Sequence, residues 1–338
     1  MLIVMKADAT EAQIAAVVDV ITELGFKPHP MPGATRTAIG ITGNQGSVDT
    51  TRFENLPGVA EAIRVSKPYK LITLDLSPDK TIVRVGDATI GDGELALIAG
   101  PCAIESREQA FAVAEAVSQS GARFFRGGAF KPRTSPYAFQ GLGEDGLKIL
   151  AEVREAYGLK IVTEALDEYG VDQLERYSDM IQIGARNMQN FMLLAEVGRA
   201  DKPILIKRGP SASVEELLMA AEYVAREGNE RIILCERGIK TFEQTTRYTL
   251  DLGSVAVLKR ETHLPVIVDP SHAAGRRDLV LPLARAAAAV GADGIIVESH
   301  PSPEEALCDG PQQIPTAEFG EFAREVREVA ELLGKRIG

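Results

Sequence analysis

The sequence predicts an α/β protein: a (β/α)8 TIM barrel preceded by a small βαββαβ ferredoxin-like domain. From Leu95 onward, short apolar strands alternate with amphipathic helices, in eight units over about 240 residues. Fully apolar strands followed by helices imply a parallel sheet that is covered on its outer face. No GxGxxG or GxxxxGK(S/T) run occurs at a strand–helix turn, which disfavours a nucleotide-binding open sheet.

Residues 1–66 form the first expected domain, a ferredoxin-like unit with a regulatory role. The expected elements are a strand at 2–6, a helix at Thr10–Leu24, strands at Phe26–Pro32 and Thr35–Thr42, a weaker helix at Val48–Leu56 and a strand at Glu61–Ser66. This is the βαββαβ order of ferredoxin-like domains. Such a unit can bind a small effector or pack at an oligomer interface, and both alternatives stay open.

Residues 67–93 are expected to link the two domains. The stretch KPYKLITLDLSPDK is extended and interrupted by prolines, and TIVRVGDATIGDG alternates around a Gly-Asp turn. The second stretch therefore predicts a β-hairpin, which can plug the base of the barrel that follows.

Residues 94–338 are expected to form the catalytic barrel. Its predicted strands are LALIAGPCAI, ARFFRGG, LKIVTEAL, MIQIGAR, PILIKRG, RIILCERG, LPVIVDPSH and GIIVESHP. The predicted helices are Arg107–Ser120, Asp145–Tyr157, Val171–Tyr177, Asn190–Gly198, Ser213–Glu227, a short piece near Phe242–Arg247, Asp278–Val290 and Glu318–Leu333. In such a barrel, functional side chains gather at the C-terminal ends of the strands.

The composition narrows the class of partner. The chain has 338 residues, of which 45% are hydrophobic, and a formal net charge of −11. That charge argues against nucleic acid or an anionic membrane, so an anionic substrate needs a local cationic pocket. Three cysteines are too few for a disulfide framework, and we find no signal peptide or membrane-spanning run. We therefore expect a cytoplasmic protein.

The stretch GGAFKPRTSPYAFQGLG, residues 127–143, is the most constrained polar segment of the chain. Its glycines permit unusual backbone geometry, and its two prolines stiffen the loop. The polar side chains in and just before it are Arg126, Lys131, Arg133, Thr134 and Ser135. Fixed guanidinium and ammonium groups suit an anionic, oxygen-rich ligand. The alternative is a solvated basic loop, which does not need so many glycines and prolines.

The strand ends bring cations to one rim of the expected barrel. These residues are Arg126, Lys131, Arg133, Arg186, Lys207 and Arg237. Any one of them alone is more often a surface charge. Together, on one face of an acidic protein, they repel one another unless an anion lies between them. We therefore expect one or two phosphate or carboxylate groups of a substrate in the barrel mouth.

The same rim carries candidate metal ligands, namely Cys102, His272, Glu298 and Asp309. One thiolate, one imidazole and two carboxylates can hold a divalent transition metal with one position left open. His263 and His300 compete for the imidazole role, and we prefer His272 because it directly follows a strand end. Cys308 can compete for the metal or be oxidised, but we expect it to be a bystander. Cys235 is expected to be core packing.

At these residues the sequence resembles the 3-deoxy-D-arabino-heptulosonate 7-phosphate (DAHP) synthases, in the branch with a short ferredoxin-like domain. The shared motifs run through the whole barrel and are AGPCAIES (99–106), RGGAFKPRTSPYAFQGLG (126–143), TEAL (163–166), IQIGARNMQNF (181–191), IKRG (206–209), LCERGI (234–239), VDPSHAAGRRD (268–278), IIVESHP (295–301) and ALCDG (306–310). The N-terminal domain matches in pattern and length. One departure is SHAAGRR, where the family often has SHSGGRR, and it touches no expected ligand.

The resemblance implies condensation of phosphoenolpyruvate with erythrose 4-phosphate, the first step of the shikimate route to aromatic amino acids. It implies these sites: metal at Cys102, His272, Glu298 and Asp309; phosphoenolpyruvate at Arg126, Lys131, Glu164, Arg186, Lys207 and Arg237; erythrose 4-phosphate at Arg133, Thr134 and Ser135. The metal is Mn2+, Fe2+, Co2+ or Zn2+, and acts as a Lewis acid on the aldehyde or positions a water. Cys102 and His272 then serve catalysis as ligands, and Glu164 or Lys131 handles protons.

Three other functions stay open. The 3-deoxy-octulosonate 8-phosphate synthases share the barrel and use arabinose 5-phosphate, but typically have KANRTS where this chain has KPRTSP. A Schiff-base aldolase would use Lys207 as its nucleophile. A non-enzymatic amino-acid sensor would depend on the N-terminal domain and leave the rim residues free to change.

Regulation and assembly follow from the same resemblance. The ferredoxin-like domain implies feedback inhibition by tyrosine or phenylalanine, through closure over the barrel mouth. No effector-binding residue can be identified from the sequence. We expect a homotetramer, because barrels of this kind usually associate.

Overall fold

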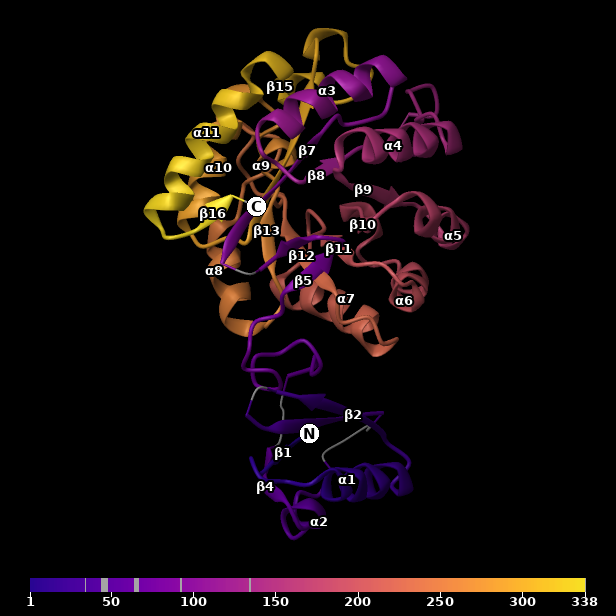
Figure 1. The fold of residues 1–338 in the computed structure, drawn as a ribbon, viewed down its shortest axis with the longest axis vertical. Coiled ribbons are helices and arrows are strands. Elements are labelled where there is room, and N and C mark those ends of the chain that lie inside the picture. The colour runs from indigo at the N-terminus through magenta and orange to yellow at the C-terminus, as the bar shows by residue number, and fades with distance from the viewer. Residues whose placement is uncertain (34, 44–47, 64–66, 92, 134, 338) are drawn as a thin grey trace. The chain divides into compact units, whose positions relative to one another are not determined.

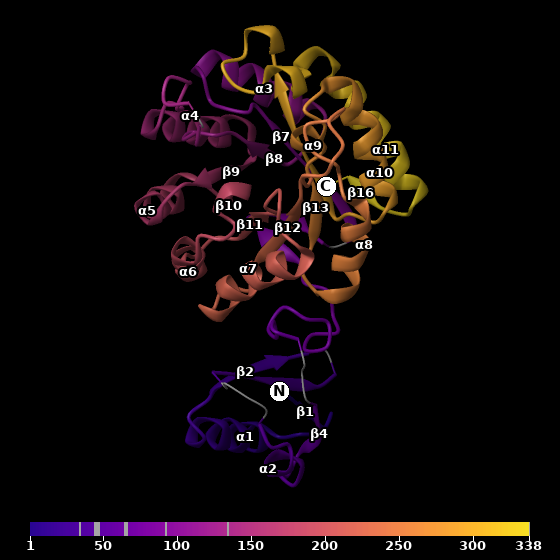
Figure 2. The same ribbon diagram turned by 180° about the vertical axis from the view of Figure 1, so that it is seen from behind.

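The computed structural model describes residues 1–33, 35–43, 48–63, 67–91, 93–133 and 135–337. Figure 1 shows the chain, and Figure 2 shows it from behind. Its contacts divide it into two compact units, Met1–Lys80 with Arg260–His263, and Thr81–Lys259 with Leu264–Gly338. Within the described ranges, no helix is both long and apolar enough to cross a membrane.

The N-terminal unit is built on a four-stranded antiparallel sheet with the strand order β2-β3-β1-β4. Its elements are β1 (Leu2–Met5), α1 (Glu11–Glu23), β2 (Lys27–Pro32), β3 (Thr37–Thr42), α2 (Thr51–Glu54) and β4 (Val59–Ile63). Both helices cover one face of the sheet (Figure 1), where Ile3, Val17 and Phe53 are fully buried in a common core. This arrangement confirms the ferredoxin-like prediction.

Local sequence explains where the N-terminal helices begin. Thr10 and Gln13 form a capping box, in which each side chain accepts a hydrogen bond from the other residue's backbone N–H. The second helix has no side-chain cap and is only four residues long, shorter than the expected Val48–Leu56. The last strand begins at Val59, and residues 64–66, where we expected it to continue, lie outside the described ranges.

The second unit is a closed barrel of eight parallel strands, which confirms the predicted TIM fold. The strands are β7 (Glu94–Gly100), β8 (Phe124–Arg126), β9 (Lys160–Ala165), β10 (Met180–Ile183), β11 (Ile204–Lys207), β12 (Ile232–Glu236), β13 (Val266–Val268) and β14 (Gly294–His300). They pair in chain order, and β14 pairs with β7 to close the sheet. Two short strands add further parallel pairs: β15 (Ile314–Pro315) pairs with β14, and β16 (Arg336–Ile337) pairs with β7.

Helices surround the barrel on its outer face (Figures 1 and 2). The α-helices are α3 (Arg107–Gln119), α4 (Glu144–Tyr157), α5 (Glu168–Tyr177), α6 (Phe191–Arg199), α7 (Val214–Arg226), α8 (Leu252–Glu261), α9 (Pro270–Ala274), α10 (Val280–Ala289) and α11 (Thr316–Leu332). The short 3-10 helices are η1 (Ala185–Asn187), η2 (Arg277–Leu279), η3 (Pro303–Glu305) and η4 (Gly310–Gln312).

One predicted helix is wrong: the segment near Phe242–Arg247 is a loop, and α8 begins only at Leu252. The Glu243 carboxylate accepts hydrogen bonds from the backbone N–H groups of Gln244 and Thr245, both at 2.8 Å. Such local side-chain bonds compete with helix formation.

The hairpin β5 (Val83–Val85) and β6 (Ala88–Ile90) lies at the N-terminal end of the barrel. The apolar residues at the two ends of each hairpin strand share one buried cluster with the inward-facing residues of the barrel strands. Asp87 at the turn binds Arg123 and Lys160, each at 2.6 Å, at the start of β8 and β9. The hairpin therefore fills the base of the barrel, and the opposite end is left for the functional site.

Candidate functional site

The alternation of side chains along each strand positions the site. Phe124, Val162, Leu205, Ile267 and Ile296 belong to the buried cluster inside the barrel. Side chains two residues apart on a strand point to the same face. The residues two positions later therefore also point inward, and these are Arg126, Glu164, Lys207, Asp269 and Glu298.

Four of the predicted residues come together as a candidate metal site at the C-terminal end of the barrel. Cys102 follows β7, His272 lies in α9, Glu298 in β14 and Asp309 just before η4. Their ligand atoms all lie within 4.8 Å of one another. One sulfur, one nitrogen and two carboxylates suit a divalent transition metal such as Mn2+, Fe2+, Co2+ or Zn2+.

Asp269 holds the His272 side chain in place. Its carboxylate accepts a hydrogen bond from the His272 backbone at 2.9 Å and contacts His272 Nδ1 at 2.8 Å. Lys207 Nζ donates to the same carboxylate at 2.5 Å. Burial alone would raise the pKa of Asp269, but His272 and Lys207 outweigh it and hold that pKa well below its usual value. Burial lowers the pKa of His272, which keeps the imidazole neutral and Nε2 available as a ligand.

Glu298 is charged although it is almost fully buried. Its Oε1 atom lies 2.5 Å from Arg126 Nη1 and 3.4 Å from His272 Nε2. Burial opposes ionisation, but His272 and Arg126 lower the pKa of Glu298 to about 2. Arg126 Nε is buried without a partner among the described residues, so this guanidinium retains a donor for a further ligand.

Cys102 has the thiol of Cys308 beside it. Its Sγ lies 3.3 Å from Cys308 Sγ, 3.7 Å from Asp309 Oδ2 and 3.3 Å from Lys131 Nζ. The hydrogen bond between the thiols raises the pKa of Cys102 and lowers that of Cys308, and Lys131 favours the Cys308 thiolate. Cys308 therefore lies close enough to Cys102 for the competing or oxidised role that we considered, and its expected role as a bystander stays a prediction.

Asp309 has an unusual backbone. Its φ of 49° makes it the one non-glycine residue with a positive φ among those that the structure describes, a region that aspartate tolerates better than most residues. Gly310 follows directly, and a Cβ there would lie 2.3 Å from the Pro303 carbonyl oxygen. The loop is thus tightly folded, and Asp309 Oδ2 reaches Arg247 Nη1 at 3.3 Å.

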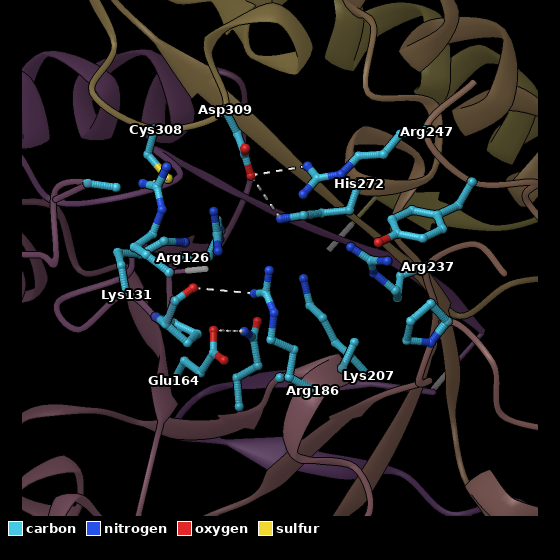
Figure 3. A pocket seen from close by; sticks show the side chains of 18 of the residues that line it. Arg126, Lys131, Glu164, Arg186, Lys207, Arg237, Arg247, His272, Cys308 and Asp309 are labelled. Atoms are coloured by element: carbon cyan, nitrogen blue, oxygen red, sulfur yellow. Dashed lines mark hydrogen bonds and ion pairs between the residues drawn. The ribbon is translucent and has the colours of Figure 1, made fainter. Parts of the chain in front are cut away.

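A cavity of about 640 Å³ opens beside this cluster (Figure 3). His272 and Asp309 line it. Glu164 and Gln182 also line it, and the Gln182 amide donates a hydrogen bond to the Glu164 carboxylate at 3.1 Å. Its basic lining residues are Arg126, Lys131, Arg133, Arg186, Lys207, Arg237, Lys240 and Arg247. Because only two carboxylates, Glu164 and Asp309, oppose these cations in the described lining, the cavity suits an anionic ligand.

Glycines make room for two of the lining side chains. A Cβ on Gly184 would lie 1.9 Å from Glu164 Oε1, and one on Gly128 would lie 2.6 Å from Lys131 Cδ. Ser135 also lines the cavity, and Arg133 Nη1 lies 2.9 Å from Cys308 Sγ. Thr134, which we predicted to bind substrate, lies outside the described residues.

The competing histidines lie elsewhere. His263 Nε2 contacts the Leu71 carbonyl oxygen at 3.0 Å, and His300 Nε2 contacts Glu105 Oε2 at 3.3 Å. Cys235 is fully buried in β12, within the barrel core.

Several site residues were missed from the sequence, namely Gln182, Lys240, Arg247, Tyr248 and Gln312. The alternation that places Glu164 inward on β9 would also have placed Gln182 inward on β10, two residues after the buried Met180. Arg247 ends the segment that we predicted as a helix, and Tyr248 follows it in the same loop. The Arg237 guanidinium lies over the Tyr248 ring, 4.5 Å from its centroid.

Comparison with known proteins assigns the chain to a family. The model of the DAHP synthetase I family matches residues 73–335, and the model of the DAHP synthase ferredoxin-like domain matches residues 1–67. The chain is 50% identical over 337 residues to the phospho-2-dehydro-3-deoxyheptonate aldolase of Thermotoga maritima, with both chains covered completely. It is 35% identical to the 2-dehydro-3-deoxyphosphooctonate aldolase of Syntrophotalea carbinolica, over 73% of this chain and 95% of that one.

Solved structures give the same assignment. The crystal structure of the T. maritima DAHP synthase superposes with a TM-score of 0.80 at 49% identity, and covers 100% of this chain and 99% of that chain. A truncated form of the T. maritima enzyme superposes with a TM-score of 0.75 at 48% identity, and covers 80% of this chain and 99% of that chain. This chain therefore belongs to the DAHP synthetase I family, in the form that carries an N-terminal ferredoxin-like domain.

Proposed function

We propose that this chain condenses phosphoenolpyruvate with erythrose 4-phosphate to give DAHP and phosphate, the first step of the shikimate route. The observation that carries the proposal is the convergence of eight basic side chains on one cavity that two members of the four-ligand cluster, His272 and Asp309, also line. Both substrates are phosphate esters, and phosphoenolpyruvate adds a carboxylate, so their charges match that lining. Full-length similarity to a phospho-2-dehydro-3-deoxyheptonate aldolase supports the same reaction.

The basic residues divide between the two substrates. Arg126, Lys131, Arg186, Lys207 and Arg237 hold the phosphate and carboxylate of phosphoenolpyruvate, with Glu164 beside them. The residues assigned to erythrose 4-phosphate are Arg133, Thr134 and Ser135. Fixing both substrates in one cavity supplies orientation as well as charge compensation.

The reaction joins C3 of phosphoenolpyruvate to the aldehyde carbon of erythrose 4-phosphate. Water then adds to C2, and phosphate leaves from the resulting tetrahedral carbon. A divalent ion held by Cys102, His272, Glu298 and Asp309 supplies Lewis-acid polarisation when it is bound. Lys131 is a proton donor for the new hydroxyl group: burial would lower its pKa, but the adjacent Cys102 raises it and keeps the ammonium charged. Glu164 then accepts the proton of the attacking water.

Two of the alternatives receive less support. The 2-dehydro-3-deoxyphosphooctonate aldolase matches at lower identity and over less of the chain than the heptonate aldolase does. The KPRTSP loop also favours the four-carbon sugar. A Schiff base on Lys207 requires a neutral amine, whereas Lys207 Nζ lies 2.5 Å from the buried Asp269 carboxylate, a partner for an ammonium group.

Phosphate release tests the reaction directly. Phosphoenolpyruvate is supplied with erythrose 4-phosphate or with arabinose 5-phosphate, before and after chelation. We expect activity with the four-carbon sugar that disappears on chelation and returns with Mn2+. Activity that ignores the chelator would remove the metal from the proposal. A preference for arabinose 5-phosphate would replace it with the octulosonate reaction.

We also propose that residues 1–66 mediate feedback inhibition by tyrosine or phenylalanine, in a cytoplasmic homotetramer. The match to a DAHP synthase ferredoxin-like domain supports a regulatory role, and three free cysteines suit a reducing compartment. Deleting residues 1–66 should abolish inhibition and spare catalysis. A truncated DAHP synthase that matches 80% of this chain has a solved structure, which supports the use of a shortened chain. Inhibition that survives the deletion would refute this role. Light scattering of the full chain tests the tetramer.

A further inference from the structure

Arg247 is tied to the short helix that carries His272. It belongs to the loop between β12 and α8, and its backbone N–H donates to the Ala274 carbonyl oxygen at 3.0 Å. Gly275, with a φ of +67°, ends α9 against this residue, and a Cβ there would lie 2.6 Å from Arg247 Cβ. The backbone of Arg247 is therefore registered against the helix that presents one metal ligand.

The Arg247 side chain connects two further ligands. Its Nη1 atom lies 3.3 Å from Asp309 Oδ2 and 3.1 Å from Gln312 Oε1. Gln312, only 2% exposed, in turn donates from Nε2 to Glu298 Oε2 at 2.6 Å. A continuous chain of contacts thus runs from Asp309 through Arg247 and Gln312 to Glu298, and Figure 3 shows its Arg247–Asp309 contact.

The charges of the two carboxylate ligands explain why this series of contacts is needed. Glu298 and Asp309 are two carboxylates of one ligand cluster, and they repel each other when no cation lies between them. Arg126 compensates Glu298 through Oε1, and Gln312 occupies the other oxygen, Oε2. Arg247 supplies the matching cation for Asp309, and among the described residues it is the one arginine or lysine that pairs with this carboxylate.

We propose that Arg247 and Gln312 form a positioning pair that holds Asp309 and Glu298 in metal-binding geometry before the metal arrives. The inference rests on the proposed metal-dependent function and concerns residues outside the ligand set. Outer partners of this kind fix the orientation of ligands and so raise metal affinity. Because both carboxylates are attached to the same pair, loss of either member should disturb both ligands.

Metal affinity of the full-length protein tests the proposal without any turnover. Metal-free wild type, Arg247→Gln and Gln312→Leu are titrated with Mn2+ or Co2+ against a chelating dye. We expect a loss of affinity of about 10- to 100-fold in each variant. The double variant should lose little more than the worse single variant, because the two residues act as one unit. Arg247→Lys should recover part of the loss, since an ammonium group can still reach Asp309.

Controls separate positioning from folding and from substrate binding. Arg276→Gln, an exposed arginine paired with Asp278, should bind metal as the wild type does. The thermal unfolding midpoint of each metal-free variant reports any general loss of structure, and the visible spectrum at saturating Co2+ reports ligand geometry.

Unchanged metal affinity and an unchanged Co2+ spectrum would overturn the proposal. If the KM for erythrose 4-phosphate then rises in Arg247→Gln, this arginine is a substrate contact instead. Wild type that binds metal but releases no phosphate would refute the proposed reaction and leave the positioning pair intact.

Discussion

The two sides of the active-site cavity differ in how their charges are balanced. On the ligand side, Glu298 and Asp309 each have an arginine within 3.3 Å. On the substrate side, Arg126 and Lys207 have carboxylate partners at 2.5 Å. Three other lining cations have no carboxylate within ion-pair distance among the described residues, namely Arg133, Arg186 and Lys240. The ligand side is therefore compensated before anything binds, whereas these three cations of the substrate side gain their counter-charge from the substrate. This difference predicts that mutations on the two sides have separable effects.

The largest effect is expected from Cys102→Ala, which removes a ligand but leaves the cation pocket in place. Metal should be lost, and kcat/KM should fall on the order of a thousandfold, because Lewis-acid stabilisation is worth several kcal/mol. Metal content and initial rates measure this, with circular dichroism to confirm folding. Full activity in the metal-free variant would contradict the division into two sides.

Hydrogen peroxide should inactivate the enzyme by oxidising the two thiols on the ligand side. Cys102 Sγ and Cys308 Sγ are 3.3 Å apart, so two thiols and one hydrogen peroxide can yield a disulfide and two waters without large movement. Metal should be released, and a dithiol reductant should restore both metal binding and activity. Thiol counting and intact mass follow the reaction. Cys308→Ser should resist this reversible loss, relative to its own untreated rate, and equal sensitivity of that variant would refute the mechanism.

Acid should destabilise the metal-free protein through Glu298. Its pKa is about 2 in the folded chain against 4.5 for a free side chain. A folded-state pKa below the unfolded one means that the stabilisation is complete above pH 4.5 and is lost as the pH falls toward 2. The difference corresponds to about 3 kcal/mol.

Urea unfolding between pH 6 and pH 3 measures this contribution. Glu298→Gln should show a flatter dependence of the free energy of unfolding on pH than wild type. Glu304→Gln is the matched control, because that carboxylate is exposed and pairs with Arg277 at the surface. Identical pH slopes in wild type and Glu298→Gln would show that the buried pair does not stabilise the fold.

Arg186→Ala should affect only the substrate side. The Arg186 side chain is exposed in the cavity, and its hydrogen bond runs to the Pro132 carbonyl oxygen at 3.3 Å. Loss of one charge-assisted contact of about 1.5–3 kcal/mol should raise the KM for phosphoenolpyruvate about 10- to 100-fold. Metal affinity should not change. An equal loss of metal affinity would show that the two sides of the cavity do not act independently.

The smallest effect is expected at Tyr248, whose ring lies under Arg237. A cation–π contact at a half-exposed site is worth about 0.5–1 kcal/mol. Tyr248→Leu should therefore raise the KM for phosphoenolpyruvate roughly two- to fivefold, whereas Tyr248→Phe keeps the ring and should be close to wild type. Steady-state kinetics of both variants give the answer. If Phe and Leu behave alike, the ring does not position Arg237.

Two neighbouring residues at the end of β11 show how much of the site periodicity could predict. Lys207 follows the inward-facing Leu205 by two positions and reaches the cavity. Arg208, the next residue, is buried on the other side, where it binds Glu236 at 2.8 Å and Asp251 at 3.0 Å. Alternation along a strand therefore distinguishes a site cation from a structural one without any structure.

By itself, the sequence determined what is periodic or local: the strands and most helices of the barrel, and the cations and ligands at the strand ends. Only the tertiary structure decided which loops meet there. Arg247 and Cys308 lie in irregular segments and Gln312 ends the short 3-10 helix η4, so no period indicates a direction for their side chains, and the Arg247 loop was predicted as a helix. Their partners are 14 to 206 residues away in the chain. Contacts over such separations depend on closure of the barrel, which brings the ends of all eight strands together and which no local stretch of sequence encodes.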